Sequence, residues 1–230
     1  MIRSLMEWLS RPATGWSDDR RTLVLSPHPD DEVLGCGGVI ARRAVAGAVV
    51  WIVHLTDGAA GNGTVAQREE EACAAAATLG LGAERLVFLR FPDGQLAEYV
   101  DAAVARVQRL ISDLGIQDLL CPYRRDYHPD HAAAWRIGRA CLRPGVRIYE
   151  YPVWYGPWLL SRLRGRARLV ALRQLIEVRR AVRVCVAEVL EVKRRALAAY
   201  RSQVAAFQAE GPWGLEFLAG FLRPYEVFFR

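Results

Sequence analysis

The stretch RTLVLSPHPDDEVLGCGGVIARRAVAG, from Arg21 to Gly47, shows most directly how this chain folds. It opens with a short apolar run, passes through a proline-stiffened turn that holds one histidine and three acidic residues, and continues with small and apolar residues at helical spacing. The apolar run predicts a buried strand over 21–26, and the last part predicts a close-packed helix over 33–47. This is the pattern of a strand that feeds directly into a helix.

The same alternation recurs along the chain. Further strands are expected at 48–58, 85–91, 118–122 and 146–152, with helices over 67–79, 96–113 and 130–141. Strands that alternate with helices of this length predict an α/β fold, a Rossmann-like three-layer α/β/α arrangement with a mostly parallel sheet. After Pro152 the alternation weakens to a helix, a short strand at 182–187, another helix and a final strand within 222–230.

Composition limits the class of protein. With 230 residues, of which 52% are hydrophobic, the chain is long enough for one sizeable core, and we expect a single domain over 1–230. No stretch resembles a signal peptide or a run of 18 apolar residues, which favours a cytoplasmic location. The five cysteines are scattered and odd in number, so neither a disulfide framework nor a thiolate zinc site is indicated.

The net charge of +6 comes from 31 basic residues, all but Lys193 being arginine. It indicates an anionic partner only weakly, and no feature indicates nucleic acid. Basic and apolar residues alternate most densely over 158–183, and three interpretations stay open for this segment. It could lie at the inner membrane face with Trp154, Tyr155 and Trp158 as anchors, rim the crevice to attract a phosphorylated substrate, or pack as an ordinary helix with a solvated basic face.

Two polar motifs follow strands that a parallel sheet would place at the same edge. The first contains His28, Asp30 and Asp31, and the second is RDYHPDHA over 125–132. Together they bring imidazoles and carboxylates to one crevice, the set being His28, Asp30, Asp31, Asp126, His128, Asp130 and His131. Catalytic zinc is held by three such ligands with one position left open. The pair of motifs therefore predicts a catalytic metal site.

Simpler explanations account for part of this pattern. One of the two adjacent aspartates could be a helix cap, but capping leaves the histidine and the second carboxylate unexplained. Gly35, Gly37 and Gly38 do not have the spacing of a dinucleotide-binding loop. His54 and Asp57 follow the second strand and could support the site, although a lone histidine at a strand end is more often a hydrogen-bonded core residue.

The sequence resembles the zinc-dependent sugar N-deacetylases of the PIG-L family, also called LmbE-like. PHPDDE at 27–32, after Ser26, is similar to the family's first motif, and HPDH at 128–131 is similar to its H-x-D-H motif. Weaker agreement extends through a Thr-Asp-Gly loop, an R-x-E-E helix start, a Pro-Asp-Gly loop and a K-x-x-A…S-Q helix, at 56–61, 68–70, 91–94 and 193–203. The resemblance thus covers 23–203.

The resemblance implies roles for particular residues. His28, Asp31 and His131 would hold Zn²⁺ or another divalent cation. Asp30 would be the general base, and His128, as an imidazolium, would stabilise the oxyanion. The supporting residues are Asp130, which would orient a histidine, and Arg68 and Asp93, which would line the sugar pocket. Ala59 and Tyr200 depart from the family pattern, which often has glutamate and histidine there, and both departures are expected to affect substrate contacts.

The predicted function is a metal-dependent hydrolase that removes the acetyl group from an N-acetylated amino sugar of the N-acetylglucosamine type. The sugar could be free, phosphorylated or lipid-linked. Two alternatives remain from the sequence. One is an amidase on another amide-bearing glycoconjugate, for example a mycothiol conjugate. The other is a basic membrane-surface binding module whose metal site is structural, and such sites are closed by four protein ligands.

Overall fold

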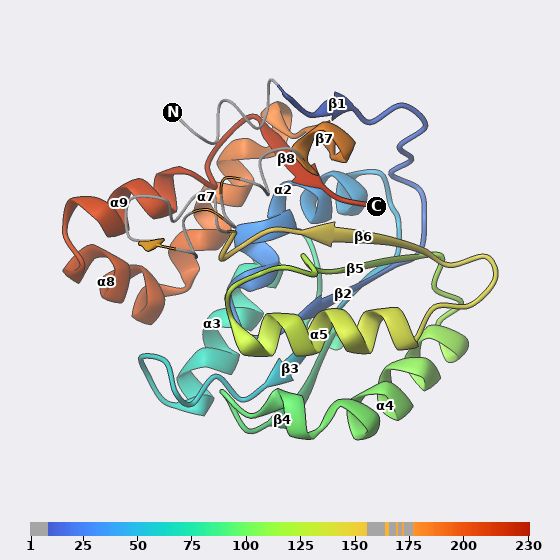
Figure 1. The fold of residues 1–230 in the computed structure, drawn as a ribbon, viewed down its shortest axis with the longest axis horizontal. Coiled ribbons are helices and arrows are strands. Elements are labelled where there is room, and N and C mark those ends of the chain that lie inside the picture. Colours follow the sequence, from blue (N-terminus) through green and yellow to red (C-terminus); the bar gives the residue numbers. More distant parts are fainter. Residues whose placement is uncertain (1–8, 156–163, 166–168, 170–171, 173–176) are drawn as a thin grey trace.

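The computed structural model describes residues 9–155, 164–165, 169, 172 and 177–230. Its central sheet has five parallel strands in the order β4-β3-β2-β5-β6 (Figure 1). The bounds are Thr22–Ser26 for β2, Val50–Thr56 for β3, Leu86–Phe91 for β4, Asp118–Pro122 for β5 and Arg147–Tyr151 for β6. The predicted α/β class with a mostly parallel sheet is confirmed. The chain reverses its direction across the sheet at β2, which makes the carboxyl ends of β2 and β5 the place where such folds bind ligands.

Helices cover both faces of this sheet (Figure 1). Alternate residues of the fully buried β2 divide between two cores: Val24 packs with α2 and α3, whereas Leu23 and Leu25 pack with α4 and α5. The helices are α2 (Asp31–Val45), α3 (Val65–Thr78), α4 (Val100–Asp113), α5 (Pro129–Ala140) and α7 (Leu190–Ala199), the last joining the core of α2 and α3. The predicted three layers follow from this two-sided burial.

A smaller sheet was only partly predicted. It contains β1 (Arg11–Pro12) parallel to β7 (Val182–Cys185), with β8 (Tyr225–Phe228) antiparallel to β7. The sequence indicated the last two strands but not β1. Helices α8 (Arg201–Ala209) and α9 (Pro212–Ala219) follow α7, and short 3₁₀ turns occur at Ala83–Arg85, Leu96–Glu98, Val178–Arg180 and Ala187–Val189. The expected helix over 96–113 is therefore divided at Tyr99, whose φ of −111° and ψ of 13° are not helical.

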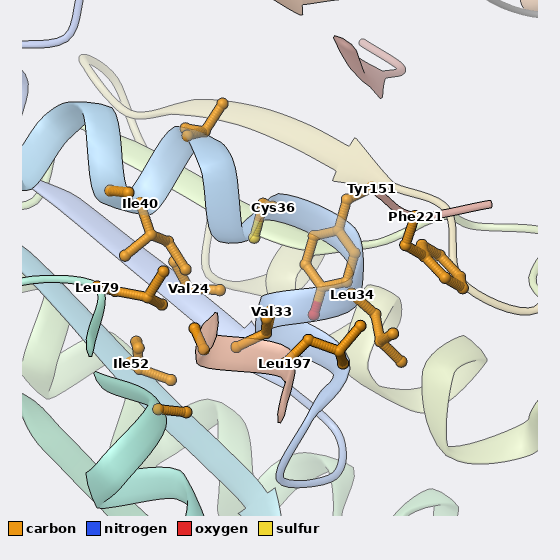
Figure 2. Packing of buried hydrophobic residues seen from close by; sticks show 14 of the residues in the cluster. Val24, Val33, Leu34, Cys36, Ile40, Ile52, Leu79, Tyr151, Leu197 and Phe221 are labelled. Atoms are coloured by element: carbon orange, nitrogen blue, oxygen red, sulfur yellow. The ribbon is translucent and has the colours of Figure 1, made fainter. Parts of the chain in front are cut away.

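Helix α2 is broken at Cys36, where φ is −146° and ψ is 21°. Gly35 is required there, since a Cβ atom would lie 2.1 Å from Cδ2 of Tyr151, whose ring lies beside this turn (Figure 2). Glu226 accepts the Gly38 amide at 2.7 Å and Lys193 Nζ at 2.6 Å, so a buried ion pair supports the second half of the helix. The glycines thus serve close packing inside a helix and form no nucleotide loop.

Most of the basic segment 158–183 lies outside the described residues, so the three interpretations of it stay predictions. The same holds for the helix expected directly after Pro152. In the part of the chain that the structure describes, no helix is both long enough and apolar enough to cross a membrane.

Candidate active site

The two polar motifs meet at one cavity. The loop after β2 and the loop after β5 leave neighbouring parallel strands at the same edge of the sheet, as expected. Together with α3, the Pro-Asp-Gly loop and α8 they enclose a cavity of about 190 Å³. It is lined by His28, Asp30, Asp31, Leu34, Ala60, Gly61, Arg68, Asp93, His128, Trp154, Gln203 and Phe207.

His28 is held by carboxylates on both sides of its ring. Its Nε2 atom lies 3.1 Å from Oδ2 of Asp130 and 3.0 Å from Oδ1 of Asp93, and its Nδ1 atom lies 3.1 Å from Oδ2 of Asp31. Asp130 is itself fixed by the Gly94 amide at 2.7 Å. If Nε2 carries the ring proton and donates it to these carboxylates, Nδ1 has no proton and its lone pair faces Asp31. Asp130 therefore lies where the resemblance expects it, against a histidine.

His131, on the first turn of α5, is fully buried. Its Nε2 atom lies 3.1 Å from Oδ2 of Asp31, and its Nδ1 atom lies 3.2 Å from Oδ2 of Asp126. Burial alone would lower the pKa of His131, but the two carboxylates raise it to about 9. Asp126 thus contacts one ring nitrogen of His131, as Asp130 contacts one ring nitrogen of His28. The sequence placed Asp126 in the cluster but gave it no role.

These donors suit a divalent cation. Oδ2 of Asp31 lies 3.1 Å from Nδ1 of His28 and 3.1 Å from Nε2 of His131. Two ligands of a tetrahedral zinc ion, each about 2.1 Å from the metal, are about 3.4 Å apart, which is close to these two distances. Neither ring nitrogen of His131 makes a hydrogen bond of good angle within the described chain, although both are buried. The Nε2 atom of His131, which faces Asp31, is therefore available to bind a cation, while Nδ1 faces Asp126.

Two other sets of donor atoms lie within 4.8 Å of one another. One is His28, Asp93 and Asp130, and the other consists of one ring nitrogen each from His28, His128 and His131. His128, however, is the N-cap of α5, and its Nδ1 atom accepts the Asp130 amide at 3.2 Å. Only its Nε2 atom is left to face the cavity. The His28, Asp31, His131 set is favoured because Asp31 lies in contact with both of its histidines.

His128 is neutral in this arrangement. A nitrogen that accepts a backbone N–H carries no proton, so the proton of the ring is on Nε2. Burial lowers the pKa of His128, and the neighbouring His131 and His28 lower it further. The structure thus differs from the expected imidazolium, since the hydrogen-bond donor offered to the cavity is the Nε2–H of a neutral ring.

Asp30 points into the cavity from a strained backbone. Its φ is 132°, in the region that favours glycine, and Oδ2 lies 3.8 Å from Nη2 of Arg68. Burial raises the pKa of Asp30 to about 7, against the lowering influence of the Arg68 charge. The carboxylates of Asp30 and Asp31 face different neighbours, as two adjacent residues with different roles require.

The two residues expected in the sugar pocket both line the cavity. Arg68 is buried, donates to the Pro29 carbonyl at 2.5 Å, and leaves its Nε atom without a partner among the described residues. Asp93 accepts the Ala60 amide at 3.0 Å and also contacts His28, so it supports the site as well as lining it.

An aromatic wall was missed by the sequence reasoning. Trp154 and Phe207 line the cavity, and both pack on Phe217, with ring centroids 4.8 and 5.1 Å apart in stacked geometry. Trp154, considered above as a membrane anchor, lines the cavity. Its position just after β6, at the same edge of the sheet as the motifs, was the available signal.

His54, Asp57 and Tyr200 have supporting positions. His54 is fully buried and stacks on Phe88 at 4.9 Å, and neither ring nitrogen has a hydrogen bond among the described residues. It is thus a core residue, whose Nδ1 atom lies 3.9 Å from Oε2 of Glu32. Asp57 accepts the amides of Ala59 and Asp93 and so shapes its loop. Tyr200 is fully buried and bonds Glu32, so its departure from the family pattern lies behind the cavity and not in it.

Known proteins resemble this chain in sequence and in fold. A relative from Bacillus cereus, named a probable N-acetyl-alpha-D-glucosaminyl L-malate deacetylase 2, is 29% identical over 82% of this chain and 86% of its own length. The conserved protein TT1542 from Thermus thermophilus is 28% identical with a TM-score of 0.67, over 92% and 94% of the two chains. N,N'-diacetylchitobiose deacetylase from Pyrococcus horikoshii shares the fold, with 20% identity and a TM-score of 0.68 over 99% and 88%.

The family model that matches is PIG-L, described as GlcNAc-PI de-N-acetylase. It covers residues 23–142, just over half of the 230 residues, and includes both His/Asp motifs. The match agrees with the resemblance drawn from those motifs, with the parallel sheet and with the cavity where the motifs meet. The chain belongs to the PIG-L family.

Proposed function

We propose that this protein is a metal-dependent N-deacetylase of N-acetylated amino sugars. The observation that carries the proposal is the convergence of His28, Asp30, Asp31 and His128 on one cavity, with His131 3.1 Å from Asp31. The names of the relatives, which refer to deacetylation of N-acetylglucosaminyl compounds and of diacetylchitobiose, support the same reaction.

His28, Asp31 and His131 would hold the cation, zinc or another divalent metal. When bound, such a cation polarises an amide carbonyl and lowers the pKa of water towards about 7. Its ligands are oriented by Asp130 on one side and Asp126 on the other, and such partners strengthen metal binding.

Asp30 and His128 perform the proton and charge chemistry. Asp30 takes a proton from the attacking water and gives it to the departing amine as the C–N bond breaks, which leaves acetate and a free amino sugar. The Nε2–H of His128 donates to the oxygen that becomes negative in the transition state. Neither step requires His128 to change its protonation state.

The cavity wall fits an amphipathic ring. Its lining combines carboxylates and Arg68 with the aromatic rings of Trp154 and Phe207. A pyranose presents hydroxyls at its edge and C–H groups on its face, so it can hydrogen-bond to the charged groups and pack on the rings. This complementarity supports a sugar as the part of the substrate next to the amide.

Acetate release from a panel of N-acetylglucosaminides tests the proposal. The panel contains N-acetylglucosamine, diacetylchitobiose, and the malate and inositol glycosides of N-acetylglucosamine. We expect zinc-loaded protein to release acetate from at least one member and Asp30→Asn to release none. Turnover confined to another acyl amide, such as a mycothiol conjugate, would make the protein an amidase. No turnover together with a metal site closed by four protein ligands would refute catalysis.

A further inference from the structure

Glu32 is a buried carboxylate that the catalytic scheme does not use. It follows Asp31, is 1% exposed, and is absent from the residues that line the cavity. One of its oxygens, Oε1, accepts the hydroxyl of Tyr200. The other, Oε2, accepts Ser26 Oγ at 2.9 Å and the backbone amide of Asp30 at 3.2 Å. Glu32 therefore connects Tyr200 to the backbone of Asp30.

Asp30 requires such a connection, because its φ of 132° is unfavourable for any residue with a side chain. On its carbonyl side the backbone is fixed, since the amides of Val33 and Leu34 donate to the Asp30 oxygen at 3.0 and 2.9 Å. On its amide side, the bond to Glu32 fixes the peptide plane whose rotation sets φ. That bond thus holds the backbone turn from which the Asp30 side chain enters the cavity.

Tyr200 is built to hold Glu32. It is fully buried in the break between α7 and α8, where its ψ of 61° leaves the helical range. Burial, and then the nearby Glu32 charge, raise the pKa of Tyr200 well above its usual value, so the hydroxyl stays protonated and donates. Its ring does not line the cavity.

We propose that Tyr200 is a positioning residue for Asp30. Its hydroxyl fixes the Glu32 carboxylate, which holds the Asp30 amide and thereby aims the catalytic carboxylate at the cavity. The effect on turnover rests on the proposed role of Asp30 as general base. The effect on the backbone does not.

Tyr200→Phe is the direct test, with Tyr149→Phe as the matched control. Tyr149 is also buried, its hydroxyl accepts a hydrogen bond from Arg230 at 3.0 Å, and it does not line the cavity. We expect kcat of Tyr200→Phe to fall about tenfold, the size expected for losing a hydrogen bond to a charged group. KM and zinc content should stay unchanged, and the control should stay within twofold of wild type. Tyr200→His, which has a hydrogen-bond donor at this position, should retain most of the kcat that Tyr200→Phe loses.

Glu32→Gln is the second variant, because it keeps the size of the side chain but replaces one acceptor oxygen with a donor. It should lose at least as much kcat as Tyr200→Phe. Crystal structures add a readout that needs no substrate, since Asp30 should relax to a negative φ in either variant. A kcat within twofold of wild type with φ unchanged would overturn the proposal, as would a loss of zinc in proportion to activity. Inactive wild-type protein would refute the proposed function, while the φ measurement would still decide the positioning.

Discussion

The double support of His28 has a measurable consequence for metal binding. Its Nε2 atom has one proton to donate, yet carboxylate oxygens of Asp93 and Asp130 lie 3.0 and 3.1 Å away. We therefore expect Asp130→Asn to weaken zinc binding only about tenfold, because Asp93 continues to orient the ring. The double variant Asp93→Asn/Asp130→Asn should weaken it about a hundredfold, the upper range for such partners. Each factor of ten corresponds to about 1.4 kcal/mol.

Asparagine is the suitable replacement because its side-chain oxygen can still accept the Gly94 or Leu96 amide that Asp130 binds. The assay is competition for zinc between the metal-free protein and a fluorescent chelator at fixed pH. Thermal melting of the metal-free variants serves as the control for folding. A single Asp130→Asn variant as weak as the double variant would refute shared support by Asp93, and a double variant with wild-type affinity would refute the orientation of His28 by either carboxylate.

Four further outcomes are expected. His131→Ala should lose most of the zinc, whereas Asp30→Asn should keep it and lose activity; metal analysis and acetate release decide this, and a fully active Asp30→Asn would exclude Asp30 as the base. His128→Ala should lower kcat by about two to three orders of magnitude with zinc content unchanged, and loss of zinc would instead make His128 a ligand. Trp154→Ala should raise KM more than it lowers kcat, and Trp154→Phe should restore KM; equal KM values would exclude the aromatic wall from sugar binding. Gly35→Ala should lower the free energy of unfolding by about 1–3 kcal/mol, because the added methyl group overpacks against the Tyr151 ring. Urea titrations measure this, and wild-type stability would mean that the ring moves aside without cost.

The repeating strands and the meeting of the two motifs were predictable from local sequence. β5 occupies the same residues, 118–122, as the apolar run that predicted it. His28 and His131 come together because carboxyl ends of adjacent parallel strands share an edge, a rule that needs only the order of elements. Sequence pattern is sufficient wherever burial on both faces of a strand dictates its composition.

Features that depend on partners distant in the chain were not predictable. β1 contains only two residues and forms because Arg11 pairs with Val182, and no local periodicity marks it. Asp126 reaches His131 because its carboxylate also accepts the amides of Val153 and Trp154, from the loop after β6. A motif therefore reveals which groups are available, while the contacts of the neighbouring loops decide how each group is oriented.

This division separates the chemistry of the protein from its selectivity. The family match ends at residue 142 and includes every histidine and aspartate assigned to the reaction. Trp154, Gln203 and Phe207, which also line the cavity, all lie beyond residue 142, as does Tyr200. The residues within this match thus include every group to which the proposed reaction assigns a proton, charge or metal role. The later residues include the proposed positioning residue Tyr200 and the rings of Trp154 and Phe207, so substitutions there are expected to change the aim of Asp30 and the choice of sugar conjugate.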